Sequence, residues 1–176
     1  AASHVGELVL VDIGIAPPAG GDRPHLIDER LVRSLLPRRR ASAHKHDTGT
    51  VLVIGGAPTY FGAPRLSAEA AARAGAGLVC VAAPEAVTRV IAGQVPELVL
   101  VPLDDSADRA AAQIIEWIDR RGGHVDTFVI GPGLGQTPHA RELLERLLAD
   151  EFSPLVAPSG EGASLPSYVL DADALN

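Results

Sequence analysis

The stretch Val51-Leu52-Val53-Ile54-Gly55-Gly56 decides the fold, because a short, wholly apolar run ends directly in two glycines. Similar runs closed by proline, glycine or aspartate follow at 78–82, 98–101, 128–130 and 168–170. Helical patterns separate them, over 65–75, 85–92, 106–121 and 138–150. Apolar strands that alternate with helices are typical of a parallel sheet covered on both faces. The sequence therefore predicts an α/β fold with a mainly parallel sheet.

Composition excludes several classes of protein. The chain has 176 residues with 15 basic and 22 acidic side chains, a net charge of −7, which does not suit nucleic acid. No apolar run approaches the roughly 20 residues of a membrane span, so we expect no membrane partner. A single cysteine excludes an intrachain disulfide framework and a cysteine-rich metal site. The absence of a signal peptide favours the cytoplasm.

In parallel sheets of this kind, ligands bind beyond the carboxyl ends of the strands, so the glycine-rich turns there are the candidate sites. Gly55 and Gly56 follow the first core strand and are candidates for close approach to a phosphate or nucleotide. Residues 131–135 (GPGLG) follow the fourth run. They fit either a tight turn that needs positive φ or a backbone nest for phosphate or ribose.

Two further groups of polar residues carry chemistry. Asp171 and Asp173 follow the last apolar run, and alternation along a continuing strand would point both carboxylates to one side. Such a pair could hold Mg²⁺ through water or orient a hydroxyl, or else cap a helix. The segment 44–47 (HKHD) contains Lys45, a candidate phosphate contact or a packed entry turn. A third distant ligand is missing from its pattern, so we predict no metal site there.

These motifs together resemble the amino half of the NAD(P)H-hydrate dehydratases, members of the ribokinase-like superfamily. The resemblance rests on these blocks, which stand in the order of the family over about residues 44–176: HKHDTG at 44–49, VLVIGG at 51–56, Gly62-Ala63, AGAGLV at 74–79, VIGPGLG at 129–135 and LDADALN at 170–176. The resemblance implies a ribokinase-like sheet with helices on both faces, incomplete at its carboxyl end. The family's pattern is interrupted by an additional run at 157–167.

The resemblance also implies an activity. The family dehydrates the S epimer of hydrated NADH or NADPH at the expense of ADP or ATP, with Mg²⁺ expected to assist phosphoryl transfer. Carried over by position, Ala63 and Gly133 or Gly135 resemble hydrate-binding residues, and Asp173 and Asn176 resemble residues of the active-site cleft. Homo-oligomers are frequent in the family, so small-molecule nucleotides and further copies of the chain are the expected partners.

The family's T-P-H-x-G-E and G-[ST]-G-D motifs are missing from the chain. The Asp of the second motif is the expected catalytic base, so we expect the base to lie beyond Asn176 and the chain alone to be inactive. Residues 6–15 (GELVLVDIGI) resemble the end of an NAD(P)H-hydrate epimerase domain. We therefore expect a fragment of a bifunctional protein, with 1–22 as an epimerase tail and linker and 23–176 as part of the dehydratase domain.

Two other interpretations remain at this point. A small-molecule kinase of the same superfamily would share the fold but release a phosphorylated product. A non-catalytic nucleotide-binding fragment would bind ligand without turnover, and the missing motifs favour it.

Overall fold

The computed structural model describes residues 27–36, 48–120, 125–148 and 166–175. The chain divides into two compact units, Ala1–Arg38 and Arg39–Asn176. The predicted boundary at residues 22 and 23 lies outside the described residues, as do residues 6–15 and the additional run up to residue 165.

The described part of the first unit is one short helix, α1 (Glu29–Leu35). Asp28 caps it, because its Oδ1 accepts a hydrogen bond of 2.7 Å from the Leu31 amide. Arg33 and Glu29 form an ion pair one turn apart on its surface. The helix extends over seven residues and has no buried side chain.

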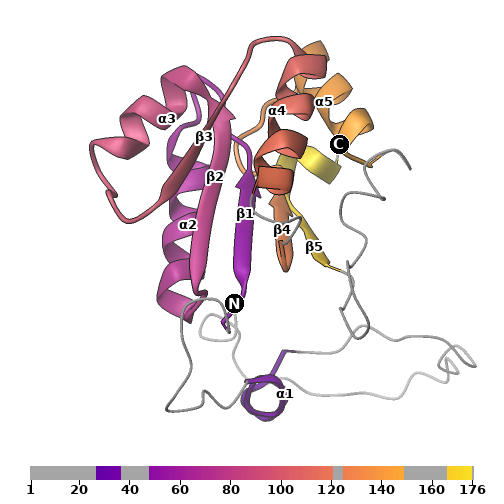
Figure 1. Ribbon diagram of the computed structural model, residues 1–176. Helices are drawn as coiled ribbons and strands as arrows, with labels where there is room; N and C mark the ends of the chain where they lie inside the picture. The colour runs from indigo at the N-terminus through magenta and orange to yellow at the C-terminus, as the bar shows by residue number, and fades with distance from the viewer. Residues whose placement is uncertain (1–26, 37–47, 121–124, 149–165, 176) are drawn as a thin grey trace, which may run out of the picture. The chain divides into compact units, whose positions relative to one another are not determined.

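The second unit is built on five strands, and Figure 1 shows them side by side. They are β1 (Thr50–Ile54), β2 (Leu78–Pro84), β3 (Val99–Leu103), β4 (Thr127–Ile130) and β5 (Ser167–Leu170). The order across the sheet is β3-β2-β1-β4-β5, and every neighbouring pair is parallel. The predicted parallel sheet is confirmed, with each of the five expected strands present.

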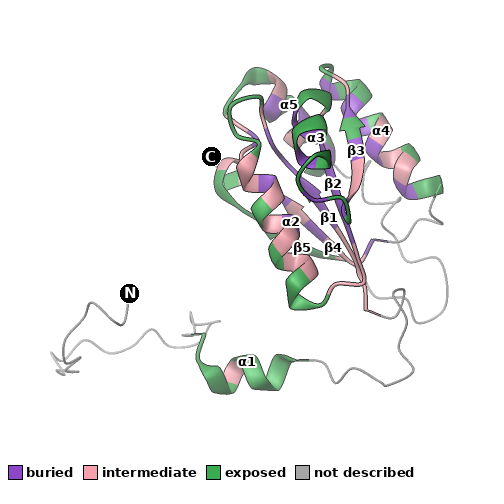
Figure 2. Cartoon of the chain, turned by 90° about the vertical axis from the view of Figure 1, so that its left-hand side faces the viewer, coloured by how far each residue is buried: buried purple, intermediate pink, exposed green. Residues whose placement is uncertain are grey.

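Helices cover both faces of the sheet, as expected (Figure 1). On one face, α2 (Gly62–Ala74) and α3 (Glu85–Ala92) pack over alternate strand residues such as Val53, Val81 and Val79. On the other face, α4 (Ala107–Arg120) and α5 (Pro138–Leu148) pack over Leu52 and Phe128. The side chains of β1 and β2 are therefore buried between two layers, which Figure 2 shows in purple. Burial on both faces explains why these strands are apolar without alternation.

One helix begins earlier than expected. α2 starts at Gly62, whereas the sequence pattern suggested a start at residue 65. Pro64 occupies the first turn, where its missing N–H would have no intrahelical partner in any case. Gly75 ends α2 with φ +108, and the Ala76 amide bonds back to the Ala71 carbonyl at 3.1 Å.

The strand order places a topological switch point between β1 and β4. From β1 the chain moves outward through β2 to β3, and β4 then returns to the opposite side of β1. Crossovers therefore leave β1 and β4 in opposite directions, which opens a crevice at their carboxyl ends. The two glycine-rich turns lie at this point.

Candidate functional site

The two glycine-rich turns are in direct backbone contact. The Gly56 amide donates to the Pro132 carbonyl at 3.0 Å, and the Gly131 amide donates to the Ile54 carbonyl at 3.0 Å. A Cβ atom on Gly55 would lie 2.4 Å from the Pro132 oxygen, closer than real Cβ atoms come. Glycine at position 55 is thus required for the two strand ends to meet.

The same bonds limit what these turns offer a ligand. The Gly55 amide donates to the Ala82 carbonyl at 3.1 Å, and the Gly56 amide is held by Pro132. Neither amide is left to bind a phosphate, and both glycines are buried, so these residues offer a ligand little accessible surface. Lys45, the other expected phosphate contact, lies outside the described residues.

Gly133 brings the second turn against the start of α2. Its φ of +63 lies in the left-handed region. A Cβ there would lie 2.7 Å from the Tyr60 carbonyl oxygen and 3.1 Å from the Cβ of Ala63. Two of the predicted hydrate-binding residues, Ala63 and Gly133, are therefore neighbours although 70 positions separate them in the chain.

Gly135 connects this turn to the segment after β5. Its amide donates a hydrogen bond of 2.9 Å to Oδ2 of Asp173. Its φ of +82 also requires the left-handed conformation that glycine tolerates best. The structure thus brings together Ala63, Gly133, Gly135 and Asp173 at the switch point, whereas Asn176 lies outside the described residues.

The expected pairing of Asp171 and Asp173 by strand alternation is wrong. β5 ends at Leu170, and residues Ala172–Leu175 form a 3-10 helix. Ala172 has φ +47, so the chain turns sharply between the two aspartates. The turn frees Asp173 to reach Gly135.

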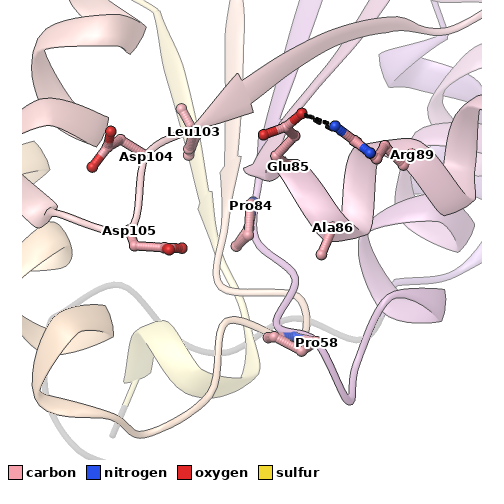
Figure 3. A pocket seen from close by; sticks show the side chains of 8 residues that line it. All are labelled: Pro58, Pro84, Glu85, Ala86, Arg89, Leu103, Asp104 and Asp105. Atoms are coloured by element: carbon pink, nitrogen blue, oxygen red, sulfur yellow. Dashed lines mark hydrogen bonds and ion pairs between the residues drawn. The ribbon is translucent and has the colours of Figure 1, made fainter.

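Three hollows lie at this carboxyl edge. The outer cavity, of about 450 Å³, is lined by Pro58, Pro84, Glu85, Ala86, Arg89, Leu103, Asp104 and Asp105 (Figure 3). The inner cavity, of about 190 Å³, shares five of these residues and adds Gly55, Gly56, Ala57, Leu134, Thr137, His139 and Leu143. The α5 cavity, of about 140 Å³, is lined by Gly135, Gln136, Thr137, Arg141, Leu144 and Asp173.

The sequence patterns did not single out Asp104, Asp105 or Arg141. A signal for the aspartates was present, since two carboxylates directly follow the strand that ends at Leu103. Arg141 gives no such signal, because its exposed position on α5 reads as ordinary helix surface. Arg141 becomes a candidate binding residue because it lines the α5 cavity together with the turn that contains Gly135.

The β5 strand carries one titratable group whose environment matters. Tyr168 stacks on Phe128 with ring centroids 5.3 Å apart and an interplanar angle of 12°. Partial burial raises the pKa of the Tyr168 hydroxyl above its ordinary value of 10.0, since the phenolate is poorly solvated there.

Within the described residues, no three histidine, cysteine or acidic side chains gather as a metal site. In the same ranges, no helix is long and apolar enough to cross a membrane.

Comparisons with solved structures agree with this architecture. A ribokinase-like superfamily protein from Enterococcus faecalis matches 85% of this chain and 45% of its own, with a TM-score of 0.62 and 22% identity. An ADP/ATP-dependent NAD(P)H-hydrate dehydratase from Bacillus subtilis, co-crystallised with ATP/Mg²⁺, matches 84% of this chain and 46% of its own. Its TM-score is 0.59 and its identity 26%. The predicted ribokinase-like fold is confirmed.

Sequence comparisons identify the family. A bifunctional NAD(P)H-hydrate repair enzyme from Salinibacter ruber is 32% identical over 99% of this chain and 31% of its own length. An ATP-dependent (S)-NAD(P)H-hydrate dehydratase from Aedes aegypti is 35% identical over 81% of this chain and 39% of its own. The chain thus spans about a third of the length of these relatives. Residues 51–176 match the family model for NAD(P)H-hydrate dehydratase, and the chain belongs to this family.

Proposed function

We propose that this chain contributes the hydrate-binding side of an NAD(P)H-hydrate dehydratase. The reaction removes water from the S epimer of hydrated NADH or NADPH at the expense of ADP or ATP. The observation that carries the proposal is the convergence of Ala63, Gly133, Gly135 and Asp173, from three separate segments, at the switch point of the sheet. Parallel sheets bind their ligands at this place.

Each residue has a definite part in the proposed site. Gly133 packs on Tyr60 and Ala63 where a Cβ would otherwise lie, and Ala63 carries only a methyl group, so no bulky side chain of these two residues stands in the way of a dihydronicotinamide ring. Asp173 is held by the Gly135 amide through Oδ2, which leaves Oδ1 to accept a hydrogen bond from a substrate hydroxyl. Holding one oxygen in this way fixes the orientation of the carboxylate before the substrate arrives.

The proposal includes ADP or ATP with Mg²⁺. Magnesium is commonly held by substrate phosphates, water and one or two carboxylates rather than by a cage of protein side chains. Asp173 fits as one such carboxylate, and the described residues contain no cluster that could hold the ion alone. When bound, the ion would neutralise phosphate charge.

The proposal also places the protein in the cytoplasm, where hydrated NADH and NADPH are soluble. It further includes the formation of homo-oligomers. Light scattering of the purified chain tests for homo-oligomers, and a single mass equal to one chain would contradict them.

The experiment is a thermal melt of the chain with S-hydrated NADH, and with intact NADH as the matched control. A ligand that binds only the folded state raises the melting temperature. We expect a larger shift with the hydrate, and the shift should be reduced in Asp173→Ala. Equal shifts with hydrate and intact cofactor would contradict the proposal.

A turnover assay with ADP and Mg²⁺ separates the competing activities. Recovery of the absorbance of reduced nicotinamide indicates dehydration, whereas a stable phosphorylated product indicates a kinase. We expect no turnover by the chain alone, since it lacks the G-[ST]-G-D motif. Turnover would show that this motif is dispensable.

A further inference from the structure

The outer and inner cavities form one continuous groove, since both are lined by Pro58, Pro84, Leu103, Asp104 and Asp105. The groove starts at Gly55 and Gly56, beside the proposed hydrate site, and runs past the carboxyl ends of β2 and β3 to the beginning of α3. Its two parts, of about 450 and 190 Å³, together have the size of a small-molecule site. A ligand at the switch point therefore has a path into it.

The walls of the groove have two chemical characters. Pro58, Pro84 and Leu103 supply apolar surface, which suits the face of a planar base. Figure 3 shows Asp105 pointing into the hollow, whereas Asp104 points away from it. Asp104 is occupied elsewhere, because its Oδ1 accepts the Ser106 amide at 2.9 Å. Asp105 is thus a side-chain acceptor that the groove offers to a ligand.

The charge of the groove disfavours phosphate. Its outer part holds three carboxylates and one guanidinium, and that guanidinium is not free. The Arg89 Nη2 lies 2.5 Å from Oε1 of Glu85, and its Nε lies 3.1 Å from the same atom. Asp105, in contrast, has no ion pair or hydrogen bond with any residue in the described ranges. An added phosphate would therefore meet uncompensated negative charge.

We propose that this groove receives the adenosine half of the hydrated dinucleotide and that Asp105 accepts a hydrogen bond from its ribose 2′-hydroxyl. A carboxylate at a strand end is well suited to a free 2′-hydroxyl and repels a 2′-phosphate. The chain then prefers hydrated NADH to hydrated NADPH. This inference rests on the proposed function and assigns the cofactor preference to a residue outside the hydrate site. Thr137 lines both the inner cavity and the α5 cavity, so these two cavities adjoin. The pyrophosphate of the bound dinucleotide would therefore pass near Arg141, which lines the α5 cavity.

The test uses two fragments as probes, adenosine 5′-monophosphate and adenosine 2′,5′-bisphosphate, in amide NMR titrations of the chain. We expect the monophosphate to perturb the amides of Ala86 and Asp105. We expect it to bind about five-fold more tightly than the bisphosphate, the effect of one like charge about 4 Å away in a solvent-exposed setting. Asp105→Asn should reduce this ratio toward one.

The matched control is Asp119→Asn, which removes an exposed carboxylate from the end of α4 that does not line the groove. It should leave the ratio unchanged. Equal binding of the two probes to the unmodified chain, or an unchanged ratio in Asp105→Asn, overturns the inference. So does perturbation of amides away from the groove.

A parallel titration with S-hydrated NADH and S-hydrated NADPH separates this inference from the proposed function. If both hydrates bind equally well, the function stands and the assignment of Asp105 fails. If neither hydrate binds while the monophosphate still perturbs the groove, the proposed function fails and so does the assignment of this groove to the hydrate.

Discussion

The amide of Gly135 donates a 2.9 Å hydrogen bond to Oδ2 of Asp173, and this bond joins the turn after β4 to the 3-10 helix after β5. The same two segments also meet at Gly131, where a Cβ atom would lie 1.8 Å from the Asp171 carbonyl oxygen. The hydrogen bond adds a side-chain link to this backbone contact, at a glycine whose φ of +82 is left-handed. The geometry of the proposed hydrate site depends on it.

Removing this carboxylate should affect both stability and binding. We expect Asp173→Ala to lower the free energy of unfolding by about 1–2 kcal/mol, because the partly buried Gly135 amide loses a charged acceptor. Asp173→Asn retains an oxygen acceptor and should lose less. Urea unfolding measures the difference, and Asp119→Ala on the exposed end of α4 is the control. Equal losses in Asp173→Ala and Asp119→Ala would contradict the importance of this bond.

Gly133 should be intolerant of any side chain. Its φ is left-handed, and a Cβ at this position would lie 2.7 Å from the Tyr60 carbonyl oxygen, so Gly133→Ala combines strain with a backbone clash. We expect a loss of about 2–3 kcal/mol in the free energy of unfolding. Gly93→Ala is the matched control, since its φ is −75 and its nearest contact would be 3.8 Å away. A loss in Gly133→Ala no larger than in Gly93→Ala would show that α2 can move away.

The elements that the sequence predicted well are those whose limits are set locally. The β1 strand was recognised because a buried run stops at Gly55, and the bounds of α3 matched because Pro84 precedes it and Gly93 follows it. The start of α2 was missed, since Gly62 and Pro64 read by composition as a turn. Whether a proline breaks a helix or opens it depends on where the first turn lies.

The site was predictable in part for a similar reason. The strand-end rule locates the glycine turns, but it does not show which of them meet. Contact between Gly133 and Ala63 depends on α2 crossing back over the sheet, a long-range property. Asp173 was misplaced because alternation was assumed to continue past Leu170, whereas the positive φ of Ala172 ends it. Asp105 was not predicted, because the candidate sites were taken from glycine-rich turns and β3 is followed by aspartates rather than glycines.

The raised pKa of Tyr168 predicts a loss of stability in alkaline solution. Desolvation favours the neutral phenol in the folded state, so the unfolded chain releases this proton first as the pH rises. The contribution of Tyr168 to the free energy of unfolding is therefore complete below pH 10.0 and decreases as the pH rises through the folded pKa. Unfolding curves above and below that pH measure it. Tyr168→Phe keeps the stacking on Phe128 and should show a smaller alkaline loss.

The Phe128 ring should be among the most sensitive core positions. It is 0% exposed, lies in the central part of the sheet and stacks on Tyr168. We expect Phe128→Ala to lower the free energy of unfolding by about 3–5 kcal/mol through lost burial and the resulting cavity. Phe128→Leu should cost less, since it fills most of the volume. Losses of the same size in both variants would indicate that the stacked ring itself is the main contribution.

Arg141 gives the sharpest test of how the proposed site handles phosphate. It lines the α5 cavity beside Gly135 and Asp173, and among the described residues it forms no ion pair. By contrast, Arg146 on the same helix is held by Asp108 at 2.6 Å. Among the described residues that line the three cavities, Arg141 is thus the arginine left to bind a pyrophosphate. We expect Arg141→Gln to weaken binding of S-hydrated NADH about five- to tenfold, an effect that salt should reduce.

The control for this prediction is Arg120→Gln, which removes an exposed charge at the end of α4 where Glu116 lies 3.9 Å away. Calorimetric titration of the hydrate at low and at physiological ionic strength distinguishes local contact from general attraction. Both variants lower the net charge by the same amount, so general attraction would weaken binding equally in the two. A specific contact lowers the affinity in Arg141→Gln alone. Equal weakening in the two variants would mean that the chain attracts the dinucleotide through its overall field, and the α5 cavity would then have no part in binding it.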